Sequence, residues 1–133
     1  LFRSFLKHPS VPATLFLKDV QEIPADLDKW VLKPLYSFAG HGVVFHVTPA
    51  DIEKAMLNPE HFILQRKVTY DPVVETLDEP AKAELRLMYV WKKDSDRPQL
   101  VINLARLSKG VMIGVDYNRN KTWVGGTVGY YAQ

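Results

Sequence analysis

Residues 30–44 read Trp30-Val-Leu-Lys-Pro-Leu-Tyr-Ser-Phe-Ala-Gly-His-Gly-Val-Val44, and they join an apolar strand that ends in a lysine directly to a loop of small residues. The strand fixes the position of Lys33. Gly40 and Gly42 lack the Cβ atoms that would keep backbone N–H groups away from a bound anion. This order of lysine and loop favours a site that holds the phosphates of a nucleotide, although so short a motif also occurs by chance and needs support from the rest of the chain.

Composition excludes several classes of protein. The chain has 133 residues, of which 47% are hydrophobic and 24% charged, as is typical of soluble globular proteins. A net charge of +2 without a concentrated basic stripe does not indicate nucleic-acid binding. The absence of cysteine excludes disulfides and thiolate chemistry and fits a reducing cytoplasm. The apolar runs are much shorter than the roughly 20 residues of a membrane helix, so we expect a cytoplasmic protein with no membrane contact.

Strands are predicted on both sides of the glycine loop. Residues 42–47 are rich in valine and phenylalanine and are expected to pair antiparallel with residues 29–33. Further strands are predicted at residues 14–17 and 61–68, and residues 2–7 are predicted to end a helix that a proline pair then breaks.

One helix is predicted to start at Thr48. Threonine is a good N-cap, a proline follows at the first helical position, and Asp51 complements the positive end of the helix dipole. Ile52, Ala55 and Met56 are then expected to share one apolar face, and an Asn-Pro pair ends the helix.

The second half is predicted to be almost entirely β. An acidic loop at residues 71–80 precedes predicted strands at 82–92, 99–107 and 111–115. Alternation places Glu84 and Arg86 on one face of the first of these strands, and Arg106 lies among apolar residues of the next. Burying charge is costly unless the charge is paired or bound by a ligand, so two alternatives remain: a structural ion pair of Glu84 with Arg106 or Arg86, or a ligand site. The predicted class is α+β with mostly antiparallel sheets and few helices.

Six short segments, taken in their order along the chain, resemble the ATP-grasp superfamily, in particular its circularly permuted branch of glutathionylspermidine synthase-like and carboxylate-amine ligase proteins. The segments are Val31-Leu-Lys-Pro34, Ala39-Gly-His-Gly42, Phe62-Ile-Leu-Gln65 with Arg66-Lys-Val68, Ala83-Glu-Leu-Arg86, Leu104-Ala-Arg-Leu107, and residues 114–126. The resemblance covers about residues 12–126. It implies an ATP-grasp-like fragment of a longer protein, with a small lobe over residues 12–68 and a β-rich lobe over residues 81–126.

The resemblance also implies a function, namely ATP-dependent joining of a small carboxylate to an amine through an acyl-phosphate. Lys33 would contact the α- and β-phosphates of ATP, because a lysine ammonium is a compact charge suited to phosphate. The loop with Ser37, Gly40, His41 and Gly42 would close over the β- and γ-phosphates as a lid. Relatives are richer in glycine here, so Ser37 and Ala39, together with His41 between the two glycines, depart from the family pattern.

Further residues receive roles from the same resemblance. The segment with Gln65, Arg66, Lys67 and Val68 would read the adenine edge through its main chain. The remaining implied residues are Glu84 for the ribose hydroxyls, Arg86 and Arg106 as catalytic groups that stabilise charge on the transferring phosphoryl, and Asn118 as a contact to phosphate or substrate.

The implied magnesium site is the weakest part of the resemblance. The family uses an acidic pair and an asparagine to bind Mg²⁺, and this set is not found in the chain. Asp116, Asn118 and Asn120 alternate in a way that suits a hard cation, but a turn is the commoner meaning of that pattern. The metal ligands are therefore expected outside this fragment, which would catalyse nothing by itself.

Two other classes of function stay open. The diluted glycine loop and the missing metal set are compatible with a non-catalytic ATP-grasp-like domain used for protein contact. The aromatic residues of the β-rich half are compatible with stacking on single-stranded nucleic acid, although the accompanying basic residues are few. The four histidines lack zinc-ligand spacing, and the chain contains no Walker P-loop and no Gly-x-Ser-x-Gly motif.

Overall fold

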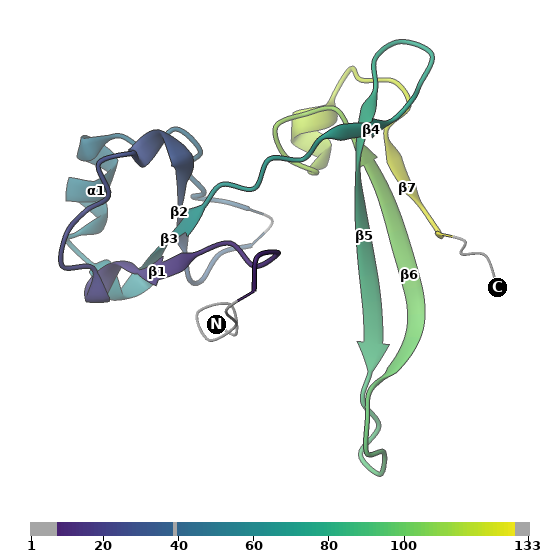
Figure 1. Ribbon diagram of the computed structural model, residues 1–133, viewed down its shortest axis with the longest axis horizontal. Helices are drawn as coiled ribbons and strands as arrows, with labels where there is room; N and C mark the ends of the chain where they lie inside the picture. Colours follow the sequence, from purple (N-terminus) through teal and green to yellow (C-terminus); the bar gives the residue numbers. More distant parts are fainter. Residues whose placement is uncertain (1–7, 39, 130–133) are drawn as a thin grey trace. The chain divides into compact units, whose positions relative to one another are not determined.

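The computed structural model describes residues 8–38 and 40–129, which form two compact units divided between Thr69 and Tyr70 (Figure 1). Each unit contains one antiparallel sheet, and helix α1 belongs to the first unit. The predicted α+β class with antiparallel sheets and few helices is confirmed. The predicted lobes at residues 12–68 and 81–126 fall in different units, and the helix predicted to end at residues 2–7 lies outside the described residues.

The first sheet contains three strands in the order β1-β3-β2, all antiparallel. Their bounds are Thr14–Phe16 for β1, Trp30–Pro34 for β2 and Phe62–Arg66 for β3. Strand β3 lies in the middle although it comes last in sequence. The strands predicted at 14–17, 29–33 and 61–68 are therefore present, with ends shifted by one or two residues.

Helix α1, Pro49–Ala55, begins where the sequence predicts. Thr48 Oγ1 accepts a hydrogen bond from the Asp51 backbone N–H at 3.3 Å, and the Asp51 carboxylate accepts one from the Thr48 N–H at 2.9 Å. This reciprocal capping box satisfies two backbone donors that the helix itself leaves unpaired. The hydrogen bonds from Thr48 lower the pKa of Asp51.

The predicted apolar face of α1 is correct except at its last residue. Ile52 and Ala55 are buried, whereas Met56 is 45% exposed. Met56 follows the final helical residue, so its side chain no longer lies over the core side of the helix. The core packs between α1 and the sheet and consists of Leu17, Trp30, Leu32, Val47, Ile52, Ala55 and Leu64.

The strand predicted at residues 42–47 is wrong, and only one antiparallel bridge of the predicted hairpin with residues 29–33 is present. Residues 42–47 contribute one isolated bridge, in which Leu32 and Val44 exchange hydrogen bonds of 3.1 and 2.9 Å. The chain then bends at residues 45 and 46 and leaves the edge of β2 to reach the helix cap. The true partner of β2 is β3, about thirty residues further along the chain.

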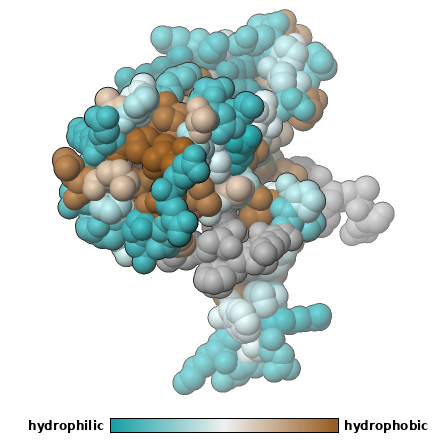
Figure 2. Space-filling model, turned by 60° about the vertical axis from the view of Figure 1, so that its left-hand side comes forward, coloured by the Kyte–Doolittle hydropathy of each residue, from teal (hydrophilic) through white to brown (hydrophobic). Residues whose placement is uncertain are grey.

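The second sheet has the order β4-β5-β6-β7 and is again antiparallel. The bounds are Pro72–Val74 for β4, Ala81–Val90 for β5, Gln99–Ser108 for β6 and Gly125–Thr127 for β7. Strands β5 and β6 form a long two-stranded ribbon that β4 and β7 flank at one end only (Figure 1). Hydrophilic residues gather at the opposite end, around the loop of residues 91–98 that joins β5 to β6 (Figure 2).

Two predictions for the second unit need correction, and one strand was missed. The acidic stretch 71–80 contains the short strand β4, and β7 was not predicted because Gly125 and Gly126 weaken the strand signal. Residues 111–115 do not form a strand; they bend and lead into a single 3₁₀ turn at Val115–Asn118. This loop folds around the side chain of Asn118, which is described below.

Across the described ranges, none of the helices has the length and apolar character needed to cross a membrane.

Candidate functional site

A row of polar side chains crosses all three strands of the first sheet. Lys33 Nζ on β2 donates to Gln65 Oε1 on β3 at 2.6 Å, and Gln65 Nε2 donates to Thr14 Oγ1 on β1 at 2.8 Å. Gln65 is only 4% exposed, and Lys33 is half-buried. Two residues that the sequence analysis nominated for different roles are thus in direct contact, while Thr14 was missed.

The loop after Lys33 requires glycine at two positions. Gly40 has φ +80° and Gly42 has φ +74°, values in the left-handed region that side chains with a Cβ rarely adopt. A Cβ on Gly42 would also lie 3.3 Å from Pro34 Cγ. Ser37 and His41 are exposed on the same loop. The loop therefore starts at the end of β2, next to Lys33, and presents its polar groups to solvent.

The side chains that follow Gln65 are held by their own unit. Arg66 Nη1 donates to Asp26 Oδ2 at 2.7 Å, and its guanidinium carbon lies 5.3 Å from the centroid of the Trp30 ring. Lys67 Nζ donates to the backbone carbonyl of Asp28, and Val68 is half-exposed. Arg66 and Lys67 thus fasten β3 to the segment that precedes β2.

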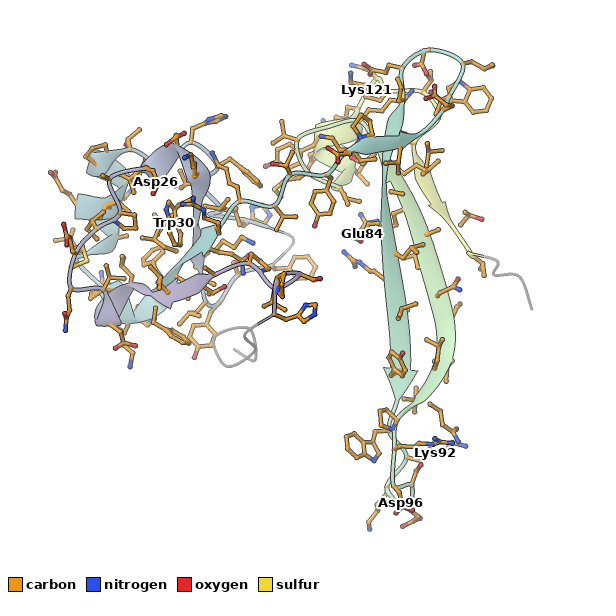
Figure 3. The ribbon with its side chains drawn as sticks, viewed as in Figure 1. Asp26, Trp30, Glu84, Lys92, Asp96 and Lys121 are labelled. Carbon is orange, nitrogen blue, oxygen red and sulfur yellow. The ribbon has the colours of Figure 1, made fainter. Side chains whose placement is uncertain are left out.

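Asp26 and Trp30 form a small cluster with Arg66 that the sequence analysis did not find (Figure 3). Trp30 Nε1 donates to Asp26 Oδ1 at 2.9 Å. Hydrogen bonds from Trp30 first, and from Arg66 second, lower the pKa of the Asp26 carboxyl. The only sequence signal was an acid four residues before a tryptophan, which is too common to indicate a contact.

The charged residues predicted on the second sheet do come together. Glu84 lies opposite Arg106 across β5 and β6. Arg86 Nε is 2.7 Å and Arg106 Nη1 is 3.5 Å from the same Glu84 oxygen, and Arg106 also donates to the Ile113 carbonyl. The ion-pair alternative of the sequence analysis is therefore present in the structure. A role of Arg86 and Arg106 toward a ligand stays a prediction.

Both the oxygen and the nitrogen of the Asn118 side-chain amide form hydrogen bonds with residues 108–114. Its Oδ1 accepts from Ser108 Oγ at 3.1 Å and from the backbone N–H groups of Lys109 and Gly110 at 2.9 and 3.0 Å. Its Nδ2 donates to the carbonyls of Met112 and Gly114 at 3.0 and 2.8 Å. In this structure Asn118 holds residues 108–114 in place, and a contact to phosphate or substrate stays a prediction.

The stretch around Asn118 is a turn. Asp116 pairs with Arg119 at 2.6 Å, and Asn120 has φ +63°. Over residues 8–38 and 40–129, no three His, Asp or Glu side chains are grouped so that they could hold a metal ion.

An ion pair with a buried lysine lies in the same unit. The Lys109 side chain is 1% exposed, and its Nζ donates to Asp78 Oδ1 and, at 2.9 Å, to Thr76 Oγ1. Thr122 Oγ1 donates to the other Asp78 oxygen at 2.6 Å. Hydrogen bonds from Lys109, Thr122 and Thr76 hold the pKa of Asp78 far below its usual range. Sequence reasoning missed this cluster, because Lys109 and Thr122 are 31 and 44 residues from Asp78 along the chain.

Described residues of the second unit also line a smaller and a larger cavity. The smaller, of about 320 Å³, is lined by Arg106 and Asn118 among others, so two nominated residues border one space. The larger, of about 670 Å³, is lined by residues 74–77, Leu107 and residues 123–127.

Comparison with known proteins identifies no relative: no protein-family model, curated protein or solved structure matches this chain.

Proposed function

We propose that this chain is the ATP-binding part of an ATP-dependent carboxylate–amine ligase, or a related ligase, that works through an acyl-phosphate. The observation that supports the proposal most is the position of Lys33. Gln65, itself hydrogen-bonded to Thr14, holds the lysine ammonium directly before a loop whose Gly40 and Gly42 are in left-handed conformations. A positioned ammonium beside a glycine loop is the chemistry that binds phosphate groups.

In this proposal Lys33 contacts the α- and β-phosphates, and the loop at residues 37–42 covers the β- and γ-phosphates and excludes water. Arg86 and Arg106 belong to the second unit, and their role in stabilising the charge of a transferring phosphoryl group is proposed separately from the lysine site. Such ligases also use Mg²⁺, but the described residues offer no cluster of acidic or histidine side chains that fits it. Among the described residues no side chain is therefore assigned as a ligand of the metal.

Thermal unfolding with and without millimolar Mg-ATP tests the proposal. A ligand present at 100 times its dissociation constant stabilises the folded state by about 2.7 kcal/mol. We expect the thermal midpoint of the parent chain to rise, and the rise to disappear in Lys33→Met. Lys54→Met is the matched control, because Lys54 is exposed on α1 and has no place in the proposed site. An equal midpoint with and without Mg-ATP in the parent chain would contradict the proposal.

A second candidate function, protein contact without catalysis, is favoured by the surface of the β5–β6 ribbon. Leu87 and Tyr89 on β5 are 53% and 55% exposed, and Val101 on β6 is 57% exposed. Large apolar side chains are exposed on both faces of this ribbon, and a two-stranded ribbon has little stability of its own in water. The exposed set is Leu85, Leu87, Met88, Tyr89, Val90, Trp91, Leu100, Val101 and Ile102.

Sedimentation equilibrium at increasing protein concentration tests the second candidate, because self-association is the contact that this chain can show without another protein. We expect association that Leu87→Ser weakens and that Leu57→Ser, a change at an exposed leucine of the first unit, does not. A monomer at every concentration, or equal association of all three proteins, would argue against it.

A further inference from the structure

The larger cavity of the second unit has no role in the proposed ATP site. One wall is the end of β4 with the loop that follows, the other is β7 with the residues before it, and Leu107 of β6 lies between them. Its volume of about 670 Å³ falls within the range of roughly 300–1,000 Å³ that small-molecule sites occupy. The side chains used in the argument are Val74, Glu75, Leu77, Leu107, Trp123 and Val124.

The two walls of this cavity are tied to each other. Thr122 Oγ1 from one wall donates to Asp78 Oδ2 from the other at 2.6 Å, and Lys121 Nζ is 2.9 Å from Glu79 Oε1 (Figure 3). The buried Lys109 ammonium adds a further bond to Asp78. These contacts join the loop after β4 to the segment before β7 and so fix the two walls of the cavity relative to each other.

Glu75 gives the cavity its charge. It is the charged residue among the lining residues, which are otherwise mostly apolar. The nearby acids Asp78 and Glu79 are paired with Lys109 and Lys121, whereas Glu75 is exposed to solvent and, within residues 8–38 and 40–129, has neither a hydrogen bond nor an ion pair to the protein. A ligand with a positive group would supply that partner, whereas an anion would be repelled.

Trp123 adds an aromatic surface to the same cavity. Trp123 is 55% exposed and is one of the residues that line the cavity, and its backbone has φ +56°. Bulky residues rarely adopt this left-handed conformation, and residues held in it are concentrated at binding and catalytic sites. The negative face of an indole ring attracts organic cations, so Trp123 and Glu75 favour the same class of ligand.

We propose that this cavity binds a small organic cation, namely an amine with an apolar or aromatic body. The body packs against Leu107, Trp123 and Val124, and the ammonium pairs with Glu75. The inference rests on the second unit alone and does not depend on ATP binding at Lys33.

Three probes that share one body and differ in their polar group test this inference: phenethylamine, 2-phenylethanol and phenylacetate. Titration calorimetry with the full chain is expected to show tightest binding for phenethylamine, about tenfold tighter than for the alcohol, which corresponds to about 1.4 kcal/mol. Phenylacetate is expected to bind most weakly. Equal affinity for the amine and the alcohol, or no binding of the amine at millimolar concentration, would overturn the proposal.

Two variants locate the binding site. Glu75→Gln is expected to abolish the preference for phenethylamine over 2-phenylethanol and to leave the affinity for the alcohol unchanged. Glu53→Gln, a change at an exposed acid of α1 in the first unit, is the matched control and is expected to keep the preference. A preference that survives Glu75→Gln would show that the cation binds elsewhere, and the proposal would fail.

Discussion

Lys109 and Asp78 form an ion pair in which only one partner is buried, because the lysine side chain is 1% exposed and the aspartate side chain 46%. The Lys109 ammonium donates to the side chains of Asp78 and Thr76. Because Thr76 is neutral, Asp78 supplies the negative charge that compensates the burial of the ammonium. An uncompensated buried charge is strongly destabilising, whereas an apolar replacement of a buried charge is often tolerated.

The first prediction follows from this asymmetry. Asp78→Asn is expected to lower the free energy of unfolding, and the double variant Asp78→Asn with Lys109→Met is expected to recover part of the loss. Urea denaturation of the parent, both single variants and the double variant gives the coupling between the two positions. Glu79→Gln, which removes the more exposed pair with Lys121, is expected to cost less than Asp78→Asn. Strictly additive effects at positions 78 and 109 would contradict the prediction.

The second prediction concerns acid stability. The pKa of Asp78 is held below that of an unfolded aspartate by hydrogen bonds from Lys109, Thr122 and Thr76. The unfolded chain therefore binds a proton at a higher pH than the folded chain does. The stabilisation is complete above the pKa of an unfolded aspartate, about 3.9, and is lost progressively as the pH falls below it. Urea unfolding between about pH 6 and pH 2 is expected to show a smaller decline for Asp78→Asn than for the parent chain, and equal declines would disprove the assignment.

The third prediction tests the loop around Asn118. Asn118→Ala removes five hydrogen bonds and leaves the backbone N–H groups of Lys109 and Gly110 without their acceptor. The expected loss is about 2–4 kcal/mol of unfolding free energy, measured by chemical denaturation. Asn120→Gly is the control: that residue is exposed and has φ +63°, which glycine adopts without strain, so less than about 1 kcal/mol of change is expected. A similar small effect of both changes would show that the loop does not depend on Asn118.

The fourth prediction concerns the glycine loop. Gly42→Ala places a Cβ 3.3 Å from Pro34 Cγ at a residue with φ +74°, so we expect a loss of about 1–2 kcal/mol in unfolding free energy. Gly125→Ala is an instructive comparison, since a Cβ there meets no atom within 4 Å although φ is +144°. Its cost then reports backbone strain without a steric contact. An unchanged free energy of unfolding in Gly42→Ala would contradict the left-handed conformation described for this residue.

Local signals predicted part of this fold, and long-range contacts account for the remainder. The start of α1 was predictable because Thr48 and Asp51, which cap it, are three residues apart. The pairing of β2 with β3 was not, because Leu64 is far from Leu32 in sequence, and the nearer segment with Val44 contributes only one bridge. Residues 111–115 have the composition of a strand, but hydrogen bonds from the Asn118 amide to the carbonyls of Met112 and Gly114 determine their path.

The candidate site shows the same division. Lys33 was predictable from the motif of strand, lysine and glycine loop, and Glu84 with its arginines from their period of two along the strands. The contact between Lys33 and Gln65 was not predictable, since it depends on the register of two strands whose residues are 32 apart. The pair of Lys109 and Asp78 had no local signal at all, and Trp123 gave no sign that it lines a cavity.

The fifth prediction separates positioning from charge at the proposed ATP site. Gln65→Met removes the oxygen that accepts from Lys33 Nζ at 2.6 Å but keeps the lysine charge and nearly the volume of the side chain. If the row through Gln65 and Thr14 positions the ammonium for phosphate, the affinity for Mg-ATP is expected to fall about tenfold, or about 1.4 kcal/mol, and less than in Lys33→Met.

Calorimetric titration of Mg-ATP into each variant measures this effect, and urea denaturation without nucleotide shows whether the variant is folded. Gln21→Met is the matched control, because Gln21 is exposed and lies outside the polar row, and its affinity is expected to equal that of the parent chain. A Gln65→Met variant that is folded and binds Mg-ATP as tightly as the parent would mean that the hydrogen bond from Lys33 to Gln65 only stabilises the sheet. The lysine would then act on phosphate without the help of its neighbours, or not at all, and the Lys33→Met titration distinguishes these two cases.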